Sequence, residues 1–188
     1  GLTNISDIKA FEYHDGVKSP CDGELSYRGY NIKDLVTGSK GKRFVFEEGA
    51  YLLLFGELPT DTQLMEFQGR LSDCMELPTN FTRDVIMKAP TSDIMGSMTR
   101  SILTLGSYDK EKESLEIPNV LRQSMQLIAV FPMLAVYAYH AYCHYEKNES
   151  MYIHRPEKDL SIAENFLRLL RPDTKFTELE ARVLDIAL

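Results

Sequence analysis

Most of the features that name a biochemical class at sight are missing from this sequence. There is no Cys-x-x-Cys pair, no glycine-rich phosphate loop, no nucleophile elbow and no apolar run long enough to cross a membrane. The three cysteines, Cys21, Cys74 and Cys143, lie far apart, which favours free thiols in a reducing, cytoplasmic compartment over a disulfide framework. The sequence therefore predicts neither a disulfide scaffold nor a membrane-spanning segment.

Positive charge is also scarce. The 188 residues include 21 Lys and Arg against 28 Asp and Glu, which gives a net charge of −7. This balance argues against nucleic acid or an anionic membrane as a partner. One small basic cluster, Lys40, Lys42 and Arg43, has no phosphate-cradle pattern around it. We therefore expect a solvated loop there rather than an anion site.

The residues that are present indicate an ordinary globular chain, with 44% apolar and 26% charged residues. Strand-like signals are confined to residues 1–30, where apolar residues flank the turn dipeptides Asp15-Gly16 and Asp22-Gly23. They predict a small β-hairpin. Residues 31–188 carry helical periodicity throughout. The predicted fold class is all-α, a multi-helix domain preceded by that hairpin.

Capping residues predict where several helices begin and end. Asn31 is placed to cap a short first helix, and Gly56 to end the next one. Three segments have the spacing of a capping box, namely Thr60–Gln63, Ser161–Glu164 and Thr177–Glu180. The last box opens a helix whose apolar face consists of Leu179, Val183, Ile186 and Leu188. Because the sequence stops inside that helix without a C-cap, we expect that it is cut from a longer chain.

The longest apolar segment runs from Pro118 to Tyr145 and is interrupted by Pro132. A proline inside a helix removes one hydrogen bond and clashes with the preceding turn. The segment therefore predicts either two helices or one strongly kinked helix. Since it is apolar on most sides, it must be buried on most sides. A chain of this size has little room for that, so we expect a subunit interface over residues 125–142.

Polar residues at helical spacing offer three candidate sites. His140 and His144 share a helix face at a spacing used for zinc. No carboxylate completes a ligand set, however, and the better explanation is that the polar ends of both side chains reach out to solvent from a buried helix. His154-Arg155 could hold an anion or be an ordinary loop cation. Ser161, Asn165 and Arg168 share one face of a later helix. The simplest interpretation gives Ser161 to capping and Arg168 to solvent.

Several segments, in order along the chain, resemble citrate synthase, and most closely the bacterial branch of that family. The opening pair is Gly23–Leu35 and Phe46–Thr60, and the later segments lie at 90–106, 127–132, 159–167 and 178–188. The resemblance covers nearly the whole chain. It implies that residues 1–188 are the N-terminal part of the family's large helical domain.

What the resemblance implies for chemistry lies mostly outside this chain. In that family two histidines and one aspartate condense acetyl-CoA with oxaloacetate, and all three are implied to follow Leu188. No catalytic residue, no metal site and no cofactor is therefore expected here; acetyl-CoA is a substrate, and the parent is expected to be a homodimer. Asn165 and Arg168 are carried over as pocket-lining, substrate-binding residues.

One departure and two alternatives stay open. Some relatives have a histidine that contributes to oxaloacetate binding where this chain has Ile162. Either Glu164, Asn165 or His154 takes over that binding role, or the position has no function in this branch of the family. The parent could instead be a 2-methylcitrate synthase, which uses propionyl-CoA. Outside the family, the chain could be a helical interaction module whose partner surface is the Pro118–Tyr145 segment.

Overall fold

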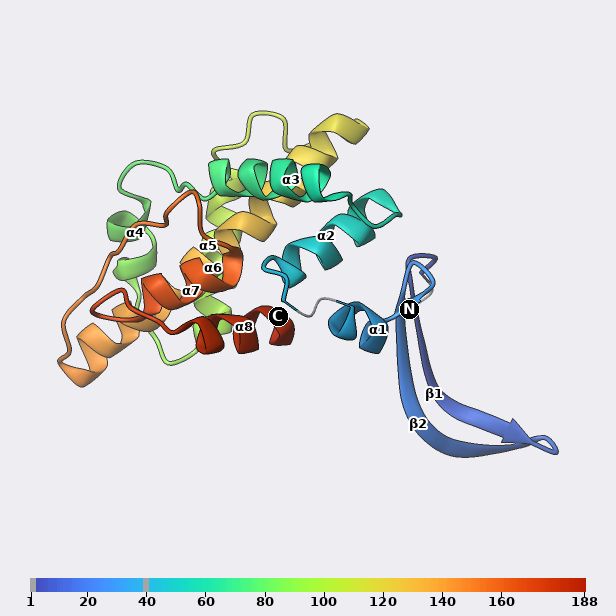
Figure 1. The fold of residues 1–188 in the computed structure, drawn as a ribbon. Coiled ribbons are helices and arrows are strands. Elements are labelled where there is room, and N and C mark those ends of the chain that lie inside the picture. The colour runs from blue at the N-terminus through green and yellow to red at the C-terminus, as the bar shows by residue number, and fades with distance from the viewer. Residues whose placement is uncertain (1–2, 39–40) are drawn as a thin grey trace. The chain divides into compact units, whose positions relative to one another are not determined.

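A computed structural model describes residues 3–38 and 41–188. Lys40 of the basic cluster lies outside the described residues. The described chain forms two compact units, the first made of residues 3–38 and 41–68 with Arg182–Leu188, the second of Gly69–Ala181. Helices dominate both units, after a small sheet at the start of the chain (Figure 1). The predicted fold class, a helical domain behind a β-hairpin, is confirmed.

The sheet has three antiparallel strands, β1 (Ser6–His14), β2 (Val17–Tyr27) and β3 (Tyr30–Asn31). Asp15 and Gly16 join the first two with φ of 50° and 79°, the left-handed pair that a two-residue hairpin turn requires. Arg28 and Gly29 repeat this geometry, with φ of 49° and 85°, before β3. The hairpin is longer than the sequence signals indicated, because β2 continues through Pro20 and Asp22-Gly23. A register shift between Lys9 and Phe11 absorbs the irregularity.

Two short-range caps in the first unit match the sequence prediction. Asn31 accepts a hydrogen bond from the Lys33 N–H at 2.9 Å and opens α1 (Ile32–Thr37). Gly56, with φ of 85°, ends α2 (Val45–Phe55). Arg28 adds a cation to this end, because its Nε and Nη2 donate to the Leu53 carbonyl at 3.3 and 2.8 Å. A positive charge at a helix C-terminus is favourable, so the loop after β2 is tied to α2.

The start of α2 has no local cap and depends on a distant residue. Phe44 precedes it with φ of 69° and makes no side-chain cap. The two carboxylate oxygens of Asp185 instead accept from the N–H groups of Val45 and Phe46 at 2.9 and 3.0 Å. Asp185 lies on α8 (Glu178–Ala187) and is only 6% exposed. A side chain 140 positions away thus performs the N-cap role.

The next helix, α3 (Asp61–Asp73), begins with the predicted capping box, in which both arms are formed. The Thr60 N–H donates to Gln63 Oε1 at 2.9 Å, and the Gln63 N–H donates to Thr60 Oγ1 at 3.2 Å. The apolar positions that follow this box in the sequence, Leu64, Phe67, Leu71 and Met75, are all buried.

The second unit is built around α6 (Ile117–Lys147), which packs against α5 (Ile94–Gly106) and α7 (Ile162–Leu170). Before α5 come the short helix α4 (Phe81–Asp84) and a 3₁₀ turn, Ile86–Lys88. Of the two alternatives for the apolar segment, the structure shows one helix of 31 residues with Pro132 inside it. Among the described residues, α6 alone is long and apolar enough to cross a membrane. Core helices share that property, and 13 of the 31 residues of α6 are buried within the fold.

Two expectations about helices 161–170 and 178–187 had different outcomes. The Ser161–Glu164 capping box is complete. In the Thr177–Glu180 box the Glu180 N–H donates to Thr177 Oγ1 at 3.2 Å. Of the Glu180 carboxylate, Oε1 accepts from the Thr177 hydroxyl at 3.1 Å and Oε2 pairs with Arg171. The expected apolar face of α8 is exposed rather than buried in this chain. Its inward residues are Ala181 and Asp185.

Candidate functional site

The sequence-predicted site residues meet at the start of α7, in the second unit. Ser161 caps the helix, since its hydroxyl accepts from the Glu164 N–H at 3.1 Å and Glu164 Oε1 accepts from the Ser161 N–H at 3.1 Å. Asn165 and Arg168 follow at one-turn spacing on the same face. All three side chains contact or adjoin the loop that precedes α7. The predicted shared face therefore exists.

Asn165 is fully buried and holds this loop. Its Oδ1 accepts from the Glu157 N–H at 2.9 Å, and its Nδ2 donates to the Glu157 carbonyl at 2.9 Å. The same Nδ2 lies 3.5 Å from Met75 Sδ. A buried amide can satisfy both backbone polar groups of one residue, and here it does so beside the Leu160 N–H, which also donates to the Glu157 carbonyl at 3.3 Å. Both ends of the Asn165 amide are thus engaged within the chain.

Arg168 holds the neighbouring part of the loop. Its Nε donates to the Arg155 carbonyl at 2.9 Å, and its Nη1 lies 3.3 Å from Glu157 Oε1. The side chain is 24% exposed, so it is less solvated than the simplest interpretation assumed. Because a guanidinium is planar and donates in fixed directions, its bonds to one carbonyl and one carboxylate hold this part of the loop in a defined position. The role of Asn165 and Arg168 as substrate-binding residues stays a prediction.

The loop held by these two side chains forms one wall of an open groove of about 780 Å³. The groove lies between residues 72–83 and the loop residues Ile153 and 155–158, with Met133 and Tyr137 of α6 also lining it. Asn165 and Arg168 do not line it; they support its wall from behind. The charged residues that line it are balanced, with Arg83, Arg155 and Lys158 against Asp73, Glu76 and Glu157. The lining therefore favours no single ligand charge.

Tyr137 connects α6 to the same loop. Its hydroxyl donates to the His154 carbonyl at 2.5 Å. Burial raises the pKa of Tyr137 to about 12, so this hydroxyl keeps its proton at any physiological pH. The His154 ring stacks on Tyr152, and its Nε2 is buried without a hydrogen-bond partner among the described residues.

The two histidines at zinc spacing serve main-chain carbonyls instead. His140 Nε2 lies 3.0 Å from the Leu169 carbonyl and joins α6 to the end of α7. His144 Nδ1 lies 2.7 Å from the Glu149 carbonyl, beyond the end of α6. In residues 3–38 and 41–188, no group of three His, Cys, Asp or Glu side chains is placed to hold a metal ion.

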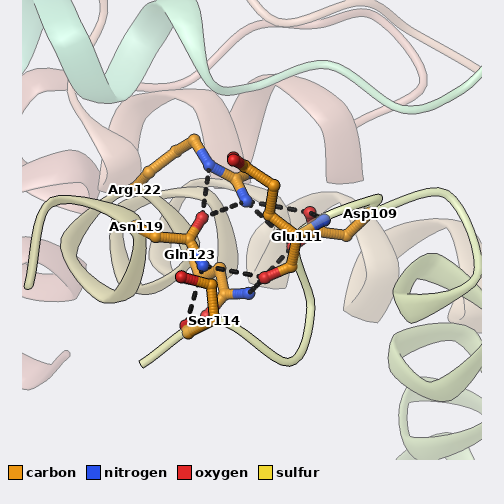
Figure 2. A network of polar contacts seen from close by, with 6 residues as sticks. All are labelled: Asp109, Glu111, Ser114, Asn119, Arg122 and Gln123. Carbon is orange, nitrogen blue, oxygen red and sulfur yellow. Dashed lines mark hydrogen bonds and ion pairs between the residues drawn. The ribbon is translucent and has the colours of Figure 1, made fainter. Parts of the chain in front are cut away.

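A second cavity, of about 300 Å³, opens beside the connection between α5 and α6. That connection is fixed by the polar network of Figure 2. Arg122 Nη2 contacts the Asp109 carboxylate at 2.9 and 3.0 Å, and Gln123 Nε2 donates to it at 2.9 Å. Asn119 Nδ2 donates to the Glu111 and Ser114 carbonyls at 2.8 and 2.9 Å.

The Asp109 carboxylate is the centre of that network. Hydrogen bonds from Gln123, the Glu111 N–H and Arg122 hold the pKa of Asp109 below its ordinary range. No local sequence signal indicated this arrangement, because its side-chain donors come from the first turns of α6 while its acceptor lies in the loop before that helix.

Fold and site together define a helical protein whose polar side chains brace loops around an open groove. Comparison with known proteins identifies it further. The family model described as "Citrate synthase, C-terminal domain" matches residues 1–188. The chain belongs to the citrate synthase family, an acyltransferase family. The description names a C-terminal domain, whereas the sequence predicts an N-terminal part; the place of the chain within its parent stays a prediction.

Individual relatives agree with this assignment. The chain is 31% identical over 165 residues to the 2-methylcitrate synthase of Shewanella oneidensis, and this alignment covers 87% of the chain and 40% of that protein. It is 30% identical over 168 residues to the citrate synthase of Saccharolobus solfataricus, and this alignment covers 89% of the chain and 40% of that protein. The chain thus spans about two fifths of the length of these relatives.

Solved structures match the fold over the whole chain. The citrate synthase of Pyrobaculum aerophilum has a TM-score of 0.77 at 25% identity, covering 100% of this chain and 43% of that one. The citrate synthase of Thermoplasma acidophilum, solved as a ternary complex with carboxymethyl coenzyme A and oxaloacetate, has a TM-score of 0.78 at 21% identity. It covers 100% of this chain and 43% of that one, and at this identity the likeness shows the fold alone.

Proposed function

We propose that the parent of this chain condenses a short acyl-CoA with oxaloacetate and releases CoA. The observation that carries the proposal is the family match across all 188 residues, together with the same fold in a solved citrate synthase. Relatives that act as citrate synthase and as 2-methylcitrate synthase are equally similar, at 30% and 31% identity. Acetyl-CoA and propionyl-CoA are therefore both candidate substrates.

Within that enzyme, the chain supplies a scaffold rather than the reacting groups. Several of its buried polar side chains hold backbone: Asn165 binds Glu157, Asp185 caps α2, and His140 binds the Leu169 carbonyl. General acid–base catalysis needs a titratable group within hydrogen-bond reach of the reacting atom. The family resemblance assigns those groups to residues outside this chain. We therefore expect the isolated chain to be inactive.

A chimera tests the proposal. The segment of Shewanella oneidensis 2-methylcitrate synthase that aligns with this chain would be replaced by residues 1–188, and CoA thiol release measured with oxaloacetate and either acyl-CoA. We expect release above the uncatalysed rate with at least one acyl-CoA, and none from the isolated chain. A chimera that folds, as judged by circular dichroism, yet condenses neither acyl-CoA would contradict the proposal.

We also propose that the chain forms a homodimer through α5 and α6. Much of the sequence-predicted surface, residues 125–142, is buried within the chain itself. The exposed part consists of Leu127 (38%), Phe131 (44%) and Tyr139 (41%) on α6. Met95 and Leu103 on α5 are 78% and 73% exposed. Apolar helix faces of this kind favour association between two copies.

A further inference from the structure

We draw no further inference here: the strongest candidate, the apolar surface of the hairpin edge strand β1, where Ile8, Phe11 and Tyr13 are exposed at 72%, 49% and 69%, carries none because nothing in residues 3–38 and 41–188 shows what covers it.

Discussion

At the residue scale, buried polar side chains in this protein hold backbone groups outside their own helices. Asp185 caps a helix that starts 140 positions earlier, and Asn165 binds both the N–H and the carbonyl of Glu157 in the loop before its helix. Such groups stabilise only while their partners stay in place, because each leaves an unsatisfied buried atom when lost. The two units of the chain each contain one of these contacts.

Replacing Asp185 by Ala should destabilise the chain by about 1–2 kcal/mol, because two N–H groups at the start of α2 lose their only side-chain acceptor. Asp185→Asn, which keeps one amide oxygen, should lose less. Urea unfolding followed by circular dichroism measures both. The control is Asp22→Ala, at an exposed position of β2, which should shift stability by no more than about 0.5 kcal/mol. Equal midpoints for Asp185→Ala and the natural chain would refute the capping role.

The Asp109 carboxylate should make the free energy of unfolding depend on pH. Its pKa is lowered from the ordinary 3.8 by the bonds from Gln123, the Glu111 N–H and Arg122. A lowered folded-state pKa gives stability that is complete above the unfolded value and is lost as pH falls through the folded one. Below pH 4 the natural chain should therefore lose stability more steeply than Asp109→Asn. Urea midpoints measured from pH 6 down to pH 2 compare the two, and parallel curves would exclude the network as the cause.

At the element scale, helix ends that depend on neighbouring residues could be predicted from the sequence, and those that depend on distant ones could not. Thr60–Gln63 forms both arms of its box as expected. At Thr177–Glu180 the Glu180 carboxylate is shared between Thr177 and the distant Arg171, and the hydrogen bond from Arg171 is the main cause that lowers the pKa of Glu180. Likewise the shared face of Asn165 and Arg168 follows from helical spacing. That it holds residues 155–157 depends on a loop path that no periodicity encodes.

Two glycines of α2 should respond to alanine in opposite directions. Gly56 ends the helix with φ of 85°, which a residue with a Cβ rarely adopts, so Gly56→Ala should destabilise by about 1 kcal/mol. Gly49 lies inside the same helix, and a Cβ there would meet no atom within 4 Å. Gly49→Ala should stabilise by up to about 1 kcal/mol. Thermal unfolding of the two variants checks the signs, and a shared sign would contradict the assigned helix end.

At the scale of the whole molecule, the chain leaves apolar side chains exposed on several of its elements. The hairpin exposes Ile8 and Tyr13 at 72% and 69%, and α5, α6 and α8 add further positions. Soluble monomers rarely keep such rows of apolar residues uncovered. Since the chain spans about two fifths of its relatives, these surfaces suit both a second copy and the rest of the fold. The apolar segment from Pro118 to Tyr145 predicted from the sequence that such surfaces must be covered. It did not predict which of its residues stay exposed.

Self-association should therefore depend on the few residues of α6 that remain exposed. Phe131→Asp places a charge in the middle of the proposed dimer surface and should weaken association at least tenfold, or about 1.4 kcal/mol. Met133→Asp could not test this, because Met133 is buried and the variant would fail to fold. Sedimentation equilibrium over a range of concentrations measures the constant. Ile8→Asp, on the hairpin, is the control, because Ile8 is also exposed, at 72% against 44% for Phe131, and it should leave the constant unchanged. A natural chain that stays monomeric at high concentration would contradict an interface through α6. Its exposed apolar residues would then be expected to contact the rest of the parent fold.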